Sequence, residues 1–247
     1  VTVGAGWALA IDSFTYVLAI LCLLKVRLPG RVRDAAGRPP SMLADLREGW
    51  GEFTSRTWLW LVVGVFGVLN ASQVGALSVL GPLIATRVPA LGVSGWALAL
   101  SAEAAGTVVM TLFMLRLSFR FPLRAGMIGI AAIAVPIGLL GVAPTTWPLV
   151  VAMVVAGAGT EVFGVGWSTA LHEHVPEEVL SRVSSFDALG SIVAIPIGTL
   201  AYGALAAVVD VRALLLISAV AYAALALGTT FSRSVRTLEQ SVRQPVG

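Results

Sequence analysis

Seven long apolar runs constrain this chain of 247 residues more than any other feature. A bilayer core about 30 Å thick is crossed by roughly 20 apolar residues of α-helix, because each residue rises 1.5 Å. The runs have that length and are apolar on every face, whereas strands of a membrane barrel alternate apolar and polar residues. The sequence therefore predicts an all-α membrane protein with seven transmembrane helices. These lie at residues 3–24, 58–80, 96–115, 125–142, 147–171, 187–209 and 211–231.

The composition excludes the main soluble classes. Hydrophobic residues make up 57% of the chain and charged residues 12%, against roughly 45–50% and about 25% in soluble domains. Too few polar side chains exist to cover a water-facing surface, so a soluble enzyme, a disulfide-rich secreted domain and a disordered chain are all excluded. The first run is no typical signal peptide, because no basic segment precedes it and it ends in Lys25 and Arg27.

The basic residues predict how the chain is oriented in its membrane. Loops rich in Lys and Arg stay in the cytoplasm, and in the predicted topology only Arg87 and Arg212 lie on the opposite side. The sequence thus predicts a protein of the cell membrane with its N-terminus outside the cell and its C-terminus in the cytoplasm. This bias explains the net charge of +3 better than a nucleic-acid partner does. The cytoplasmic bases are Lys25, Arg27, Arg31, Arg33, Arg38, Arg47, Arg56, Arg116, Arg120, Arg124, Arg182, Arg233, Arg236 and Arg243.

One loop is much longer than the others and divides the chain. Residues 25–57 separate the first run (1–24) from a group of six (58–231), and a tail follows at 232–247. Within this loop Ser41 can cap a short helix whose apolar residues recur at three and four: Leu43, Leu46, Trp50 and Phe53. That helix either lies on the cytoplasmic membrane surface or packs against the bundle as a connector.

Three stretches carry a resemblance to a known family: AIDSFTYVLAILCLLKVRLP at 10–29, LREGWGEFTSRTWLWL at 46–61, and the segment 157–203. Together they resemble span six, the inter-half loop and spans ten and eleven of the major facilitator superfamily. The segment 176–190 is the most specific and resembles the enterobactin-exporter and macrolide-efflux-like branch. The loop 116–124 keeps the bases of the superfamily's gating loop but lacks its glycine and aspartate.

The resemblance implies the architecture of a secondary transporter. The first run would be span six, and the last six would form the C-terminal half of the fold, with spans one to five absent from this sequence. Two halves that rock around a central cavity move a substrate by alternating access. The expected function is proton-coupled efflux of a small amphipathic molecule, drug or siderophore, with no cofactor. Its expected partners are the lipid bilayer, the substrate and the missing N-terminal half.

Three acidic residues within the runs are candidates for proton coupling: Glu161, Glu103 and Asp12. A charged side chain at mid-membrane costs about 2.5–3.5 kcal/mol on insertion scales, so it usually faces a cavity or has a partner. The alternative for each acid is a structural hydrogen bond to a neighbouring helix.

Polar residues elsewhere suggest a cavity and a gate. Asn70 and Gln73 lie three residues apart, and Ser168 shares a helix face with Glu161. We expect them to line the substrate cavity, although interhelical hydrogen bonds would explain the first two equally well. Arg182 and Asp187 are candidates for a cytoplasmic gate, with a static topology anchor as the alternative.

Other motifs exclude competing functions. His172, Glu173 and His174 do not have the spacing of a zinc site, and no phosphate-binding glycine loop with its lysine is present. Lys25, the single lysine, lies at a span end, so retinal cannot be held there. No metal and no enzymatic activity are expected. A seven-helix receptor and a truncated half without transport activity remain the alternatives. Trp58, Trp60, Trp96 and Trp147 fall at span ends, typical of an interface belt.

Overall fold

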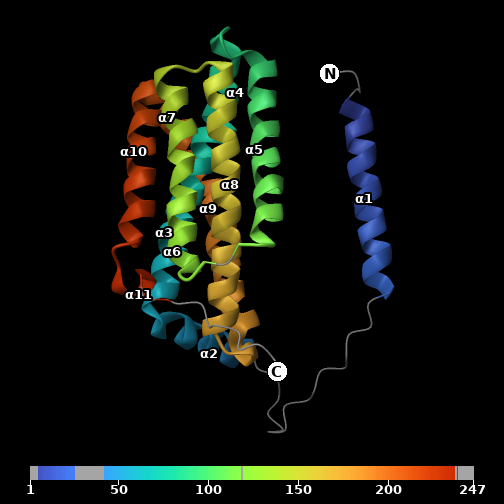
Figure 1. Cartoon of the computed structure of the whole chain (residues 1–247), viewed down its shortest axis with the longest axis vertical. Coiled ribbons are helices and arrows are strands. Elements are labelled where there is room, and N and C mark those ends of the chain that lie inside the picture. The colour runs from blue at the N-terminus through green and yellow to red at the C-terminus, as the bar shows by residue number, and fades with distance from the viewer. Residues whose placement is uncertain (1–4, 26–41, 118, 237, 239–247) are drawn as a thin grey trace. The chain divides into compact units, whose positions relative to one another are not determined.

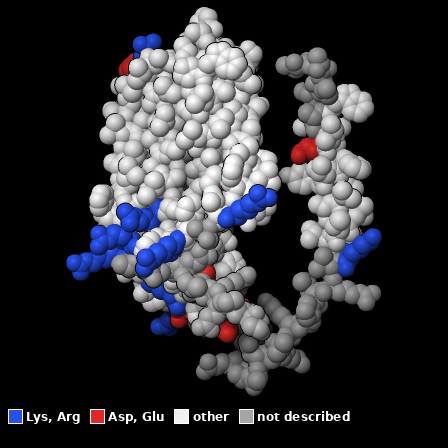
Figure 2. Space-filling view, viewed as in Figure 1, with Lys and Arg blue, Asp and Glu red and all other residues white. Residues whose placement is uncertain are grey.

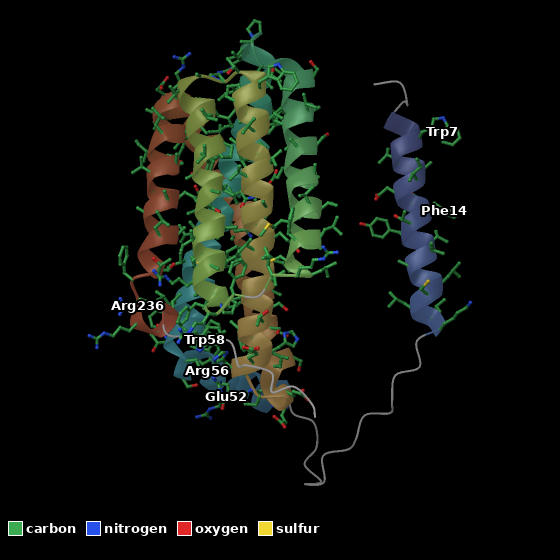
Figure 3. The ribbon with its side chains drawn as sticks, viewed as in Figure 1. Trp7, Phe14, Glu52, Arg56, Trp58 and Arg236 are labelled. Atoms are coloured by element: carbon green, nitrogen blue, oxygen red, sulfur yellow. The ribbon has the colours of Figure 1, made fainter. Side chains whose placement is uncertain are left out.

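The computed structural model describes residues 5–25, 42–117, 119–236 and 238, and it divides the chain into two units. In the first, Val1–Ser41, the described residues form helix α1 (Ala5–Lys25), at the position of the first apolar run (Figure 1). Trp7 and Phe14 stand out from it, both largely exposed (Figure 3). Residues 26–41 of the loop expected at 25–57, including the Ser41 cap, and the tail from 239 onward lie outside the described residues.

The second unit, Met42–Gly247, is a bundle of long helices (Figure 1). Within the described residues, this unit has six helical spans that are long and apolar enough to cross a membrane. Chain order is: α2 (Met42–Ser55); a first span of α3 (Thr57–Gln73), η1 (Val74–Leu80) and α4 (Gly81–Arg87); α5 (Gly92–Met114); a third span of α6 (Pro122–Ile130), η2 (Ala131–Ile133) and α7 (Ala134–Val142); α8 (Thr146–His174); α9 (Glu177–Val208); α10 (Val211–Thr229); and α11 (Arg233–Arg236). No strand occurs in the described ranges.

Two spans differ from the expected bounds. The first continues to Arg87 instead of ending at residue 80, because the π-helical segment η1 leads directly into α4. Pro82 does not stop it, since it lies in the first turn of α4, where an N–H is not needed. The helix expected from residue 187 begins at Glu177, since acidic residues favour a helix N-terminus even where the chain is no longer apolar.

Glycines set the closest helix contacts in the bundle. A methyl group on Gly157 or Gly106 would collide with the backbone of the facing helix, at Glu103 or Val154 respectively, so α5 and α8 touch backbone to backbone. Gly129 and Gly159 face each other in the same way between α6 and α8. Small residues of this kind are what let membrane helices approach closely, so α8 is the central helix of this side of the bundle.

Helix α2 packs onto the start of α9. The rings of Trp50, Phe53 and Phe186 lie within 5.8 Å of one another, centroid to centroid, and Phe53 is buried. A Cβ on Gly49 would lie 2.9 Å from the Cβ of Arg182. Helix α2 therefore packs against the bundle, as the connector alternative for this segment requires.

Candidate functional site

Charged side chains collect at the ends of the bundle. In Figure 2 the blue side chains gather at the end that carries α2 and α11, the broad band above them is uncharged, and a small charged group lies at the opposite end. Arg236 and the ion pair of Arg56 with Glu52 lie at this basic end (Figure 3). An uncharged band between two charged ends fits a protein that crosses a bilayer.

Glu161 lies on the same face of α8 as two exposed residues. Its side chain is half-buried, and Gly164 and Ser168, three and seven residues later on that face, are exposed. A methyl group on Gly164 would meet nothing within 4 Å. Ser168 is 3.5 Å from Nδ1 of His172, measured from its hydroxyl oxygen, and that Nδ1 donates to the Ser168 carbonyl. Polar groups on an open face at membrane depth are suited to a polar ligand or water.

Glu103 lies at the contact between α5 and α8. Its carbonyl oxygen faces Gly157, and the hydroxyl of Thr107 lies 3.1 Å from the Glu103 carbonyl and 3.2 Å from the Gly157 carbonyl. The Glu103 side chain is half-buried. Its backbone thus lies at a closed helix contact, whereas Glu161 lies beside an open face.

Asn70 forms an interhelical hydrogen bond, which was the alternative to a role in lining the substrate cavity. Its amide donates to the carbonyl of Ser191 on α9 at 3.3 Å. Gln73 is half-buried, and its side chain forms no hydrogen bond within the described part of the chain. The two residues thus share a stripe in sequence, but among the described residues only the Asn70 side chain is hydrogen-bonded to α9.

The candidate gate residues both lie on α9. Asp187 accepts a hydrogen bond of 2.9 Å from the indole N–H of Trp167 on α8, while Arg182 contacts Gly49 of α2 through its Cβ. The start of α9 is therefore held by α8 on one side and by α2 on the other. Asp12, the third acid, lies exposed on α1, where its carbonyl accepts from the hydroxyl of Thr15 at 2.7 Å.

An aromatic stack that the sequence analysis missed joins α3 and α8. Phe66 stacks on Phe163 with centroids 4.6 Å apart, Phe163 on Trp167, and Trp167 meets Trp58 edge to face. Trp58 is 7% exposed and lies close to the end of the bundle that carries α2 (Figure 3). The four-residue spacing of Phe163 and Trp167 was the available signal, because residues at that spacing share a helix face.

The tryptophan belt is only half correct. Trp60 and Trp147 are exposed, as expected of interface residues. Trp58 and Trp96 instead face other helices: Trp96 lies against Gly81, which has no side chain to exclude its ring. Span-end position predicted their depth but not their direction.

A seam of small residues between the first span and α9 was also missed. Gly67, Ala71 and Gly75 repeat every four residues on α3 and η1, and Gly190, Ala194 and Gly198 repeat in the same way on α9. A methyl group on Gly198 would collide with the backbone of Ala71. Two facing small-xxx-small patterns are a readable sequence signal for helix contact.

The described residues contain no group of three or more His, Cys, Asp or Glu side chains placed to hold a metal ion. His172, Glu173 and His174 form the last turn of α8. Each histidine Nδ1 lies within hydrogen-bond distance of a carbonyl one helical turn earlier, on Ser168 or Ala170.

Comparison with known proteins agrees with this architecture. The family model of the Major Facilitator Superfamily matches residues 69–245, more than half of the chain. Comparison with curated proteins and with solved structures gives no match. The matched region contains most of the first span and all five spans that follow. The chain therefore belongs to the major facilitator superfamily, whose members are membrane transporters.

Proposed function

We propose that this chain is the C-terminal portion of a proton-coupled exporter of small amphipathic molecules, drugs or siderophores. The single observation that carries the proposal is the open face of α8, where Gly164 and Ser168 are exposed on the same side as the half-buried Glu161. A carboxyl beside such an open face is suited to take up and release a proton next to a substrate.

The proposal assigns the uncovered face to a central cavity shared with an N-terminal half. Family members transport by rocking one half against the other, and the six spans of the second unit are the size of one half. Helix α1 would then be span six, and five further spans would be encoded upstream. Sequencing the adjacent coding region tests the prediction of five upstream spans. An in-frame start codon next to Val1, together with a seven-span product that is stable in the membrane, contradicts it.

Glu161 is the first candidate for the coupling carboxyl, followed by Glu103 and Asp12. Open surroundings favour Glu161, because a proton carrier must meet water in at least one state. Asn70, Gln73 and Ser168 are the proposed cavity residues, although the bond of Asn70 to Ser191 gives it a second, structural role. Arg182 and Asp187 are the proposed cytoplasmic gate, in which Asp187 exchanges Trp167 for another partner between states.

The test is efflux of a fluorescent cationic dye, ethidium, from vesicles that contain the complete transporter. Glu161→Gln keeps the shape of the side chain but cannot carry a proton, so we expect proton-driven efflux to be abolished while the protein folds normally. Glu178→Gln is the matched control, since Glu178 is an exposed acid at the start of α9. Unimpaired efflux by the Glu161 variant removes this residue from the mechanism and transfers the role to Glu103 or Asp12.

A further inference from the structure

The first span contains a wide turn in its middle. Between α3 and α4 the backbone is π-helical over Val74–Leu80, and the N–H of Gly81 donates to the carbonyl of Ala76, five residues earlier. A π segment holds more residues in each turn than an α-helix, so it changes the direction in which all later side chains point. Such segments occur often at functional sites.

Two aromatic rings from different helices lie against glycines at either side of this turn. Tyr202 of α9 covers Gly75, and Trp96 of α5 covers Gly81. At both positions a methyl group would overlap the ring. If the segment became α-helical, the residues after it would move in register and bring Leu80 or Pro82 toward Trp96 in place of Gly81. The π turn is therefore what lets both glycines meet their rings at once.

A chain of hydroxyl groups holds this arrangement together. Ser72 lies 2.8 Å from the Tyr202 hydroxyl, which lies 2.6 Å from Ser218 of α10, measured between oxygens. Ser218 donates its one proton to the carbonyl of Leu214 at 2.7 Å. Tyr202 must therefore donate to Ser218, and Ser72 to Tyr202, because each hydroxyl has a single proton. The chain ends on a backbone carbonyl, so it serves as an anchor that joins three helices.

We infer that Tyr202 is a positioning residue whose hydroxyl holds the π segment Val74–Leu80 in register, and so sets the direction of α4. The ring fills the space above Gly75, and the hydroxyl ties α3 and α10 to α9 beside the wide turn. When these bonds open, the segment is free to change register and α4 turns about its axis. The register itself follows from these contacts, whereas its use in a transport cycle rests on the proposed function.

Tyr202→Phe isolates the hydroxyl because it keeps the ring over Gly75. The chain offers a matched control in Tyr222→Phe. Tyr222 is buried, 1% exposed, and its hydroxyl has no hydrogen-bond partner in the described part of the chain. Loss of two hydrogen bonds should speed amide exchange in residues 74–80 on the order of 5- to 30-fold for the Tyr202 variant, while the control stays at the wild-type rate.

The measurement is hydrogen exchange with mass spectrometry on the full chain in lipid nanodiscs. Ser72→Ala removes the same chain from its other end and provides a milder variant if the tyrosine variant folds poorly. Because both changes break one network, the double variant should exchange no faster than the stronger single variant. The inference is overturned if residues 74–80 exchange at the wild-type rate in both Tyr202→Phe and Ser72→Ala. It is also overturned if Tyr222→Phe speeds their exchange as much as Tyr202→Phe does.

A second readout reports the direction of α4 itself. Thr86, exposed on α4, becomes a cysteine in a chain whose Cys22 is replaced by serine, and its rate of labelling by a soluble maleimide is followed. We expect Tyr202→Phe to change that rate at least threefold. Faster exchange together with unchanged labelling and unchanged ethidium efflux in the complete transporter contradicts a role in the transport cycle. Absence of ethidium efflux in the wild type contradicts the proposed function and leaves the register result standing.

Discussion

The seam between α3 and α9 and the open face of α8 are built from similar residues and have opposite surroundings. Each combines glycines with polar side chains at spacings of three and four. In the seam, Gly198 lies against the backbone of Ala71 and the Asn70 amide finds the Ser191 carbonyl. On α8, a methyl group on Gly164 would meet nothing within 4 Å, and in the described part of the chain the bonds of Ser168 stay within its own helix.

The difference shows what a polar residue in a membrane helix means. A buried polar group opposite a neighbouring backbone is satisfied and structural, whereas the same kind of group on an uncovered face remains available to a ligand. The closed seam therefore holds the bundle together, and the open face is where we propose that transport chemistry takes place. Substitutions matched between the two regions can break or sharpen this distinction.

The largest effect is expected at the seam glycine Gly198. Gly198→Ala should lower the free energy of unfolding by about 1–3 kcal/mol, because the added methyl group collides with the backbone of Ala71. Gly203→Ala on the same helix is the control, since a methyl group there meets nothing within 4 Å. Unfolding by dodecyl sulfate in mixed micelles measures both, and equal stability of the two variants contradicts the closed seam.

A smaller effect is expected from the amide in the seam. Asn70→Ala removes the bond to the Ser191 carbonyl and should cost about 0.6–1 kcal/mol, the usual value for an interhelical bond in a membrane. Gln73→Ala serves as the comparison, since the Gln73 side chain forms no hydrogen bond within the described ranges. The same micelle titration applies, and a greater loss for Gln73→Ala would reverse our assignment of these two residues.

The smallest effect on stability is expected on the open face. Gly164→Ala and Ser168→Ala should each change the free energy of unfolding by no more than about 0.5 kcal/mol, because both positions are exposed and a methyl group on Gly164 would meet nothing within 4 Å. A loss above about 1 kcal/mol from Gly164→Ala would mean that this face is covered, and the proposed cavity would have to lie elsewhere.

Much of the fold could be predicted from hydropathy, whereas the direction of individual side chains could not. The six spans of the bundle lie at the expected runs, because apolar length alone decides whether a helix can cross a bilayer. The predicted end of the span at 58–80 was wrong, because Pro82 is tolerated at the start of α4 and the span continues to Arg87. Trp58 and Trp96 were wrongly assigned to the interface, because depth in the membrane does not tell which side of a helix faces its neighbours.

The sequence by itself determined the class of the protein, the positions of its spans and the candidate polar residues within them. These depend on local composition, because each helix that crosses a bilayer must be apolar and must satisfy its own backbone hydrogen bonds. Only the tertiary structure decided which polar groups are satisfied: Ser72 and Tyr202 are 130 positions apart, yet their oxygens lie 2.8 Å apart. Such a pairing depends on how close small residues let two helices come, and that is a property of both helices together.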